Sequence, residues 1–373
     1  MTASASVSRA GRLDCVCEPG VLDRTDTDRR GVALLAIGFA LSILSQVLTL
    51  SILPLAGLAF APSRSLSTLP FTAFYAGAVL ASLPASLLLD SFGRRAAFSL
   101  GASLGAAGGL ILVWALIKMH FGALVLGAFW LGTAGGFSLF YRHAAVPMGG
   151  RGGRAALLVF GAATIAAIIA PTLATKADSL STHAFVGIAV VASLTHLLTL
   201  ACTAALPYRR LRQRLLSEHS APLRWQWLAL PTGISALAWF LMTGLMGATP
   251  IAMVGCGLSE AVPETIAWHI MAMYAPSLVL ACAPTVIRPA HVAATAALLL
   301  GIAVLAFTMS SGVLGFSVAT VLLGTGWSLA TLGSTLWLHG AGEPSRWQLG
   351  THDGIVLTGA LIGAITAGIL ATP

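Results

Sequence analysis

Long apolar runs separated by short polar segments occupy the chain from residue 32 to residue 371. Each run is about 20 residues long, which is the length that an α-helix needs to cross a hydrocarbon core about 30 Å thick. A bilayer offers the backbone no hydrogen-bond partners, so such runs are expected to be helical. The pattern predicts eleven membrane spans, at residues 32–54, 70–89, 96–117, 121–141, 155–175, 184–206, 227–251, 264–286, 292–310, 313–338 and 354–371.

A polar, strongly basic segment at residues 207–224 divides these runs into a group of six and a group of five. The predicted organisation is therefore a six-helix bundle at residues 31–206, a basic linker, and a five-helix bundle at residues 225–373. Residues 1–30 are polar and mixed in charge, and no short apolar core with a cleavage site begins the chain. We predict that this tail is disordered and that the tail and the linker are cytoplasmic.

The composition excludes a soluble protein. The chain is 57% hydrophobic and 9% charged, with a mean hydropathy of +0.91, whereas a soluble domain carries about 25% charged residues. The net charge of +8 does not require nucleic acid as a partner, because its distribution has another explanation. With the amino terminus inside, three of the 20 Lys and Arg residues fall in outer segments, namely Arg64, Lys118 and Lys176. This asymmetry predicts a multi-pass protein of the bacterial inner membrane with a cytoplasmic amino terminus and a periplasmic carboxyl terminus.

The loop between the second and third predicted spans carries a short charged motif, made by Asp90, Gly93, Arg94 and Arg95. It resembles the loop between helices 2 and 3 of the major facilitator superfamily of secondary transporters. The pattern of that family is Gly, three residues, Asp, a basic residue, any residue, Gly, Arg, and then Arg or Lys. Ser86 stands in place of the first Gly, and Ser91 in place of the basic residue. The alternative is an ordinary positive inner loop with an incidental Asp.

Other segments extend this resemblance over residues 31 to 371. They include Leu83-Pro84-Ala85-Ser86, Phe140-Tyr141-Arg142-His143-Ala144-Ala145, Thr249-Pro250-Ile251-Ala252-Met253 and Gly324-Thr325-Gly326-Trp327-Ser328. These segments are similar to a poorly characterised bacterial branch of the superfamily, some of whose members are linked to riboflavin uptake. The resemblance implies an all-α, two-bundle membrane fold with inverted three-helix repeats in each half. A twelfth helix is apparently lacking, and the equivalent loop of the second half, residues 287–291, has lost the motif.

Substrate contacts are expected from spans one, four, seven and ten, which line the cavity in transporters of this superfamily. Near mid-depth these spans offer Gln46, Trp130, Trp239, Trp327 and Ser328. One amide and three aromatic rings suit a small organic solute that is flat or amphipathic. His269 in the eighth span is a further candidate, because histidine titrates near neutral pH. In the alternative interpretation the tryptophans pack or face lipid, and the histidine is neutral and bonded to a neighbouring helix.

The twelve Asp and Glu residues fall in the tail, in loops or at the ends of predicted spans. A buried carboxylate is the usual carrier of a coupled proton, so this placement argues against classical proton symport and leaves the coupling ion open. Cys15 and Cys17 have one residue between them, which is closer than in common zinc pairs. The sequence shows no nucleotide-phosphate loop or metal-ligand cluster, and we predict no cofactor and no metal.

The charged motif is also expected to act as a conformational latch. In the superfamily its Asp faces the start of helix 11, whose unsatisfied amide groups carry partial positive charge. Here that start lies near Asp353, which could cap its own helix. We therefore expect a charge cluster that closes the inner face between the two halves, made by Asp90, Arg94, Arg95 and Asp353, with Gly93 in the same loop.

These features favour a secondary active transporter that moves a small organic solute by alternating access. They argue against an enzyme, since no intramembrane carboxylate, metal or nucleophile constellation is apparent. The alternative function is a degenerate carrier that no longer transports and serves as a membrane assembly or interaction subunit. The lacking twelfth helix and the decayed second-half loop favour that alternative, whereas the intact charged motif and the polar-aromatic cavity favour transport.

Overall fold

The computed structural model describes residues 24–148, 153–207, 223–282 and 288–371. Most of the predicted tail and of the predicted linker lies outside the described residues. Within them, eleven segments are long and apolar enough to cross a membrane. The predicted all-α, polytopic fold and its number of spans are confirmed.

The helices follow the apolar runs of the sequence. The first set is α1 (Arg24–Phe60), α2 (Leu69–Ser91), α3 (Gly93–Lys118), α4 (Phe121–Ala145), α5 (Arg154–Gly161), α6 (Ala163–Ser179) and α7 (Val186–Ala204). The second set is α9 (Ala229–Gly255), α10 (Val262–Cys282), α11 (Pro289–Thr308), α12 (Val313–Ala341) and α13 (Arg346–Ala371). Because α1 begins at Arg24, the last part of the predicted disordered tail is helical.

The fifth predicted span consists of two consecutive helices. α5 ends at Gly161 and α6 begins at Ala163. A Cβ at Gly161 would collide with Leu278 of α10, so glycine permits a close approach of α5 to that helix. The break therefore lies where the first set of helices meets the second.

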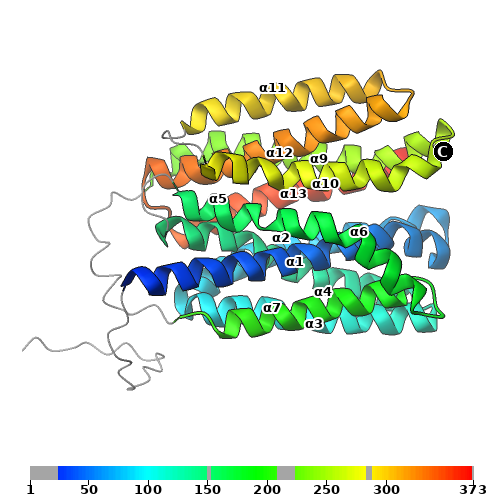
Figure 1. The fold of residues 1–373 in the computed structure, drawn as a ribbon, viewed down its shortest axis with the longest axis horizontal. Coiled ribbons are helices and arrows are strands. Elements are labelled where there is room, and N and C mark those ends of the chain that lie inside the picture. The colour runs from blue at the N-terminus through cyan, green and yellow to red at the C-terminus, as the bar shows by residue number, and fades with distance from the viewer. Residues whose placement is uncertain (1–23, 149–152, 208–222, 283–287, 372–373) are drawn as a thin grey trace, which may run out of the picture.

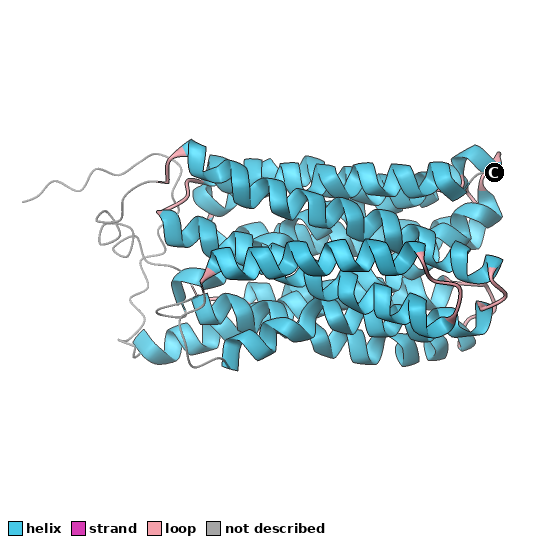
Figure 2. Ribbon diagram, turned by 90° about the horizontal axis from the view of Figure 1, so that it is seen from above, coloured by secondary structure: helices cyan, strands magenta, loops and turns pink. Residues whose placement is uncertain are grey.

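The long helices run nearly parallel to one another, with connecting loops at the two ends (Figure 2). Figure 1 shows α9 to α13 along one side of the molecule and α1 to α4 with α7 along the other. We call α1–α7 the N half and α9–α13 the C half. The halves meet where α2 packs on α13 and where α5 and α6 pack on α10. The residue boundaries assigned to the two bundles stay a prediction.

The two ends of the molecule differ in charge. One end, at the left of Figure 1, holds the start of α1, the α2–α3 connection and the start of α13. We call it the basic end, because Arg94, Arg95, Arg154 and Arg346 lie at helix termini there. The last described residues of α13 lie at the opposite end, as an odd number of spans requires.

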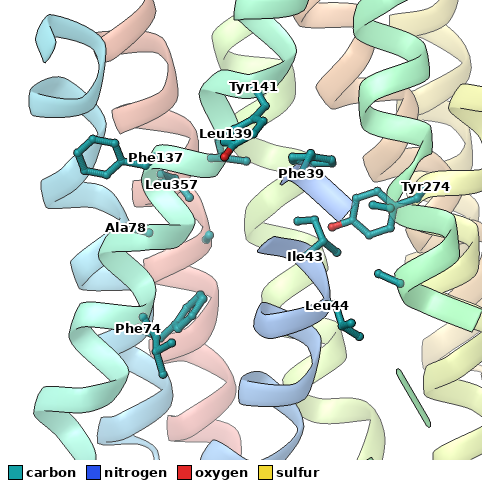
Figure 3. Close-up of a cluster of buried hydrophobic side chains, with 14 of the residues drawn as sticks. Phe39, Ile43, Leu44, Phe74, Ala78, Phe137, Leu139, Tyr141, Tyr274 and Leu357 are labelled. Atoms are coloured by element: carbon teal, nitrogen blue, oxygen red, sulfur yellow. The ribbon is translucent and has the colours of Figure 1, made fainter. Parts of the chain in front are cut away.

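Buried apolar side chains fill the centre and form one continuous cluster across both halves. Phe39 of α1 lies between Tyr141 of α4 and Tyr274 of α10 (Figure 3). The three rings come from both halves and bridge the space between them. This central packing places aromatic side chains at the boundary between the two halves.

Candidate functional site

An aromatic cluster joins the two halves. It consists of six buried rings, Phe39 of α1, Tyr141 of α4, Phe160 of α5, Trp239 of α9, Tyr274 of α10 and Trp327 of α12. Phe39 stacks on Phe160 with ring centroids 5.5 Å apart, and Phe160 lies 5.2 Å from Tyr274. Trp239 meets the edge of Trp327 at 4.9 Å. These separations fall within the favourable range for aromatic pairs.

The polar atoms of the two tryptophans in the aromatic cluster, and of Ser328 next to Trp327 in the chain, differ in whether they have a hydrogen-bond partner. Trp239 donates from Nε1 to Thr331 Oγ1 at 3.1 Å. In the part of the chain that the structure describes, Trp327 Nε1 and Ser328 Oγ are buried without a hydrogen-bond partner. Buried polar groups are normally paired. A hydrogen bond to either atom would therefore break no bond among the described residues.

The other predicted substrate contacts lie outside this cluster. Gln46 is half-buried and donates from Nε2 to Ser138 Oγ at 3.0 Å, between α1 and α4. Trp130 is half-buried and packs edge-on against Phe129, with its Cβ beside Gly108 of α3. The structure thus brings Trp239 and Trp327 together, with Ser328 next in the chain.

His269 packs within the C half. It is buried, and its Nδ1 lies 2.7 Å from the carbonyl oxygen of Thr320 on α12. Its Nε2 is buried without a partner among the described residues. The first contact corresponds to the alternative interpretation of this histidine, a ring bonded to a neighbouring helix.

A second feature, which we call the buried polar network, lies between the aromatic cluster and the basic end. Its members are Arg142 and His143 of α4, Thr232 of α9, Thr335 and His339 of α12, and His352 and Asp353 of α13. Arg142 donates from Nη2 to Asp353 Oδ1 at 2.5 Å and from Nε to Thr335 Oγ1 at 2.9 Å. Arg142 and Asp353 are 1% and 0% exposed, so this ion pair between the halves is shielded from water.

Three histidines surround the ion pair. His143 Nδ1 lies 3.1 Å from His339 Nε2, and His143 Nε2 lies 3.4 Å from Asp353 Oδ2. His352 Nδ1 lies 2.7 Å from Thr232 Oγ1. Removing one partner of such a pair costs about 3–5 kcal/mol, because the other charge is left buried and uncompensated. The buried polar network therefore joins the halves through charged and polar side chains that depend on one another.

The predicted role of Asp353 as a helix cap is wrong. α13 begins at Arg346, so Asp353 lies seven residues, or about two turns, inside the helix. The position of Asp353 inside α13 also contradicts the expectation that all acids lie in the tail, in loops or at the ends of predicted spans. Arg142, counted with the inner-loop cations, is instead buried within the fourth span.

The charged motif contacts the C half at Arg346, and not at Asp353 as expected. Asp90 Oδ1 lies 4.0 Å from Arg346 Nε, and both side chains are partly exposed. Ser86, which replaces the glycine of the family pattern, donates from Oγ to the Arg346 carbonyl at 2.7 Å. The expected four-residue cluster is thus divided in two, since Asp353 pairs with Arg142 and Asp90 lies beside Arg346.

The remaining motif residues shape the α2–α3 connection. Gly93 has φ +81°, in the left-handed region that favours glycine, and it opens α3. Arg94 donates from Nη1 to Met148 Sδ at 2.7 Å, next to the end of α4. Among the described residues, no three His, Cys, Asp or Glu side chains are arranged to hold a metal ion.

Comparison with known proteins decides the family. No family model matches the chain. The chain is 30% identical over 360 residues to "Riboflavin transporter RfnT" of Brucella anthropi, an alignment that covers 92% of this chain and 89% of that protein. The chain belongs to the major facilitator superfamily. Members of this superfamily are membrane transporters and not enzymes, as predicted.

Solved structures of this superfamily share the fold. The human organic anion transporter MFSD10 (TETRAN) superimposes with a TM-score of 0.71 at 16% identity, over 92% of both chains. The Escherichia coli fucose:proton symporter FucP, as an N162A variant, gives a TM-score of 0.57 at 13% identity, over 92% of this chain and 98% of that one. At these identities the similarity shows the fold alone.

Sequence reasoning missed the buried polar network. The sequence places Arg142 among the inner-loop cations and places Arg142 and His143 in a segment that carries the family resemblance, but neither observation predicts their depth in the bundle. One signal was available, because Ala144, Ala145 and Val146 continue the apolar character after the two charges. A helix that continues past Arg142 carries that charge into the bundle.

Proposed function

We propose that this chain moves a small, flat aromatic solute of the riboflavin type across the bacterial inner membrane by alternating access. The observation that carries the proposal is the aromatic cluster, because its rings come from both halves and could hold a planar ring system by stacking. The 30% identical riboflavin transporter supports the same class of solute.

Each predicted substrate residue has a proposed part. Trp239 and Trp327 stack on the solute, while Trp327 Nε1 and Ser328 Oγ donate to its carbonyl groups. Gln46 and Trp130 line the path within the N half, and His269 lines it within the C half. These two buried donors have no partner in the part of the chain that the structure describes, and they give the site polar selectivity without a charged side chain.

The basic end is proposed to face the cytoplasm, since the positive charges gather there. In this orientation the contacts of Asp90 and Ser86 with Arg346, together with the Arg142–Asp353 pair, form the inner latch. A topology reporter fused after Pro373 should then be active in its periplasmic form. Activity of the cytoplasmic form alone would reverse the assignment.

Uptake in a riboflavin-requiring bacterial strain tests the function. Expression of the chain should support growth at low external riboflavin and give saturable uptake of labelled riboflavin. The Trp239→Ala, Trp327→Ala double variant, matched for membrane abundance, should give neither. If the unaltered chain reaches the membrane and moves no flavin or other tested solute, the non-transporting assembly subunit becomes the better interpretation.

A further inference from the structure

The pair of helices α10 and α12 in the C half packs less closely than the pair α2 and α4 in the N half. Gly77 of α2 and Gly132 of α4 each lie where a Cβ would collide with the backbone of the other helix. α10 contains no glycine, and Gly324 of α12 makes a contact of this kind with the His269 carbonyl. Because glycine lets two helices approach closely, α10 and α12 meet near Gly324 and can separate farther along.

A groove of about 510 Å³ lies between α10 and α12. Met271, Ala275 and Val279 line it from α10, and Val321 and Leu329 line it from α12. It opens to the outside of the bundle, since Val279 is 71% exposed. Its described lining contains no charged side chain. Both helices are long and apolar enough to span the membrane, so the groove opens into the hydrocarbon of the bilayer.

The dimensions of the groove fit one extended hydrocarbon chain. Its lining on α10 extends from Trp268 to Leu280, twelve residues or about 18 Å along the helix. One leaflet of a bilayer is about 15 Å deep, half of a hydrocarbon core of about 30 Å. Over that length the volume corresponds to a mean cross-section of about 28 Å², whereas a helix 10 Å across fills about 79 Å². The groove is therefore too narrow to enclose a membrane helix.

The charges around the groove indicate which leaflet supplies the chain. Leu280 lies two residues before the end of α10 at Cys282, toward the basic end. At that end the exposed Arg288 directly precedes α11, a helix that packs on α12. Beyond the other end of the groove, Glu260 and Glu264 are exposed. Arginine binds phosphate well and glutamate repels it, so a phosphate headgroup belongs at the basic end.

We propose that this groove binds one phospholipid of the leaflet at the basic end, with an acyl chain between α10 and α12 and the phosphate at Arg288. The acyl chain contacts Ala275 and Pro276, which directly follow Tyr274 in α10. Tyr274 packs against Phe160 and Trp327 in the aromatic cluster. The lipid thus packs against the membrane side of the helix that carries Tyr274, and this site does not depend on which solute is moved.

Photocrosslinking of the full-length protein in phosphatidylcholine vesicles tests the site. The probe is a small fraction of phosphatidylglycerol with a diazirine on one acyl chain. Peptide mapping should find at least fivefold more label on residues 272–280 of α10 than on residues 290–298 of α11, which lie equally near the basic end and include exposed positions. Label in proportion to exposure on both helices would indicate an ordinary lipid-facing surface and overturn the proposal, as would a groove crosslinked to a second copy instead of lipid.

A pair of matched variants tests whether the groove itself holds the acyl chain. Ala275→Phe fills the groove from α10, whereas Ala297→Phe adds the same ring on the exposed surface of α11. Ala275→Phe should reduce the label on α12 at the groove at least fivefold, and Ala297→Phe should leave it unchanged. Thermal unfolding verifies that both variants are folded. Equal labelling of the groove in the two folded variants would contradict the site.

A third variant tests the headgroup without altering the groove. Arg288→Ala should reduce groove labelling by the phosphatidylglycerol probe at least threefold, but not labelling by a diacylglycerol probe with the same acyl chain. Arg154→Ala is the matched control, since Arg154 is an exposed cation at the basic end of the N half. It should change neither signal. Equal losses in both arginine variants, or no loss in either, would overturn the proposed phosphate contact.

Discussion

The aromatic cluster and the buried polar network both join the N half to the C half, but they do so with different chemistry. In the aromatic cluster, rings meet through short-range contacts, and Trp327 Nε1 has no partner among the described residues. In the network, Arg142 is bonded through all three of its nitrogens. A planar solute can replace one ring contact with another at low cost, whereas removing one partner of a buried ion pair costs several kcal/mol. We therefore propose binding at the aromatic cluster and closure at the buried polar network.

The largest effect is expected from Arg142→Ala, which leaves Asp353 buried without its counter-charge. We expect a loss of about 3–5 kcal/mol of stability, measured by unfolding of the purified protein, and no uptake. The Arg142→Met, Asp353→Leu double variant should recover most of the stability but none of the uptake. A double variant as unstable as Arg142→Ala would contradict the charge-pair explanation.

Substitution in the aromatic cluster should change affinity more than stability. Trp327→Phe keeps a ring and removes the unpartnered Nε1, which we propose donates to the solute. One such hydrogen bond is worth about 0.5–1.5 kcal/mol, so the KM for riboflavin should rise roughly two- to tenfold. Trp114→Phe is the matched control, since Trp114 is 50% exposed on α3. An equal KM change in both variants would remove the cluster from the binding site.

The smallest effect is expected at the surface of the basic end. Asp90 and Arg346 are 4.0 Å apart and partly exposed, and exposed ion pairs contribute about 0.2–1 kcal/mol. Asp90→Asn should therefore reduce uptake by less than about fivefold, through a shift toward the inward-open state, with normal amounts of folded protein. A loss of uptake as complete as in Arg142→Ala would show that the exposed motif, rather than the buried network, controls closure.

The contrast between the two regions also explains what the sequence could predict. Apolar length determines the spans, so their number was predictable, and the mid-span positions of Trp239 and Trp327 indicated the bundle interior, where both side chains are buried. Asp353 was not found as a buried acid, because the start of α13 is polar and was assigned to a loop. Hydropathy measures transfer to lipid, whereas Asp353 is shielded by other helices and by Arg142. The paired geometry of Arg142 and Asp353, far apart in the chain, required the structure.

The central claim is that solute crosses only if the halves separate at the basic end. A Cβ at Gly350 of α13 would lie 3.2 Å from Ser86 Cβ of α2, slightly less than the roughly 3.5–4.5 Å between the Cβ atoms of a disulfide, so a small outward shift would let two cysteines bond. Riboflavin counterflow should be measured with the Ser86→Cys, Gly350→Cys variant, in a background with the five native cysteines replaced by alanine, before and after reduction. The account predicts no counterflow in the oxidised protein and full recovery after reduction. Equal counterflow in both forms, with the disulfide verified, would contradict it.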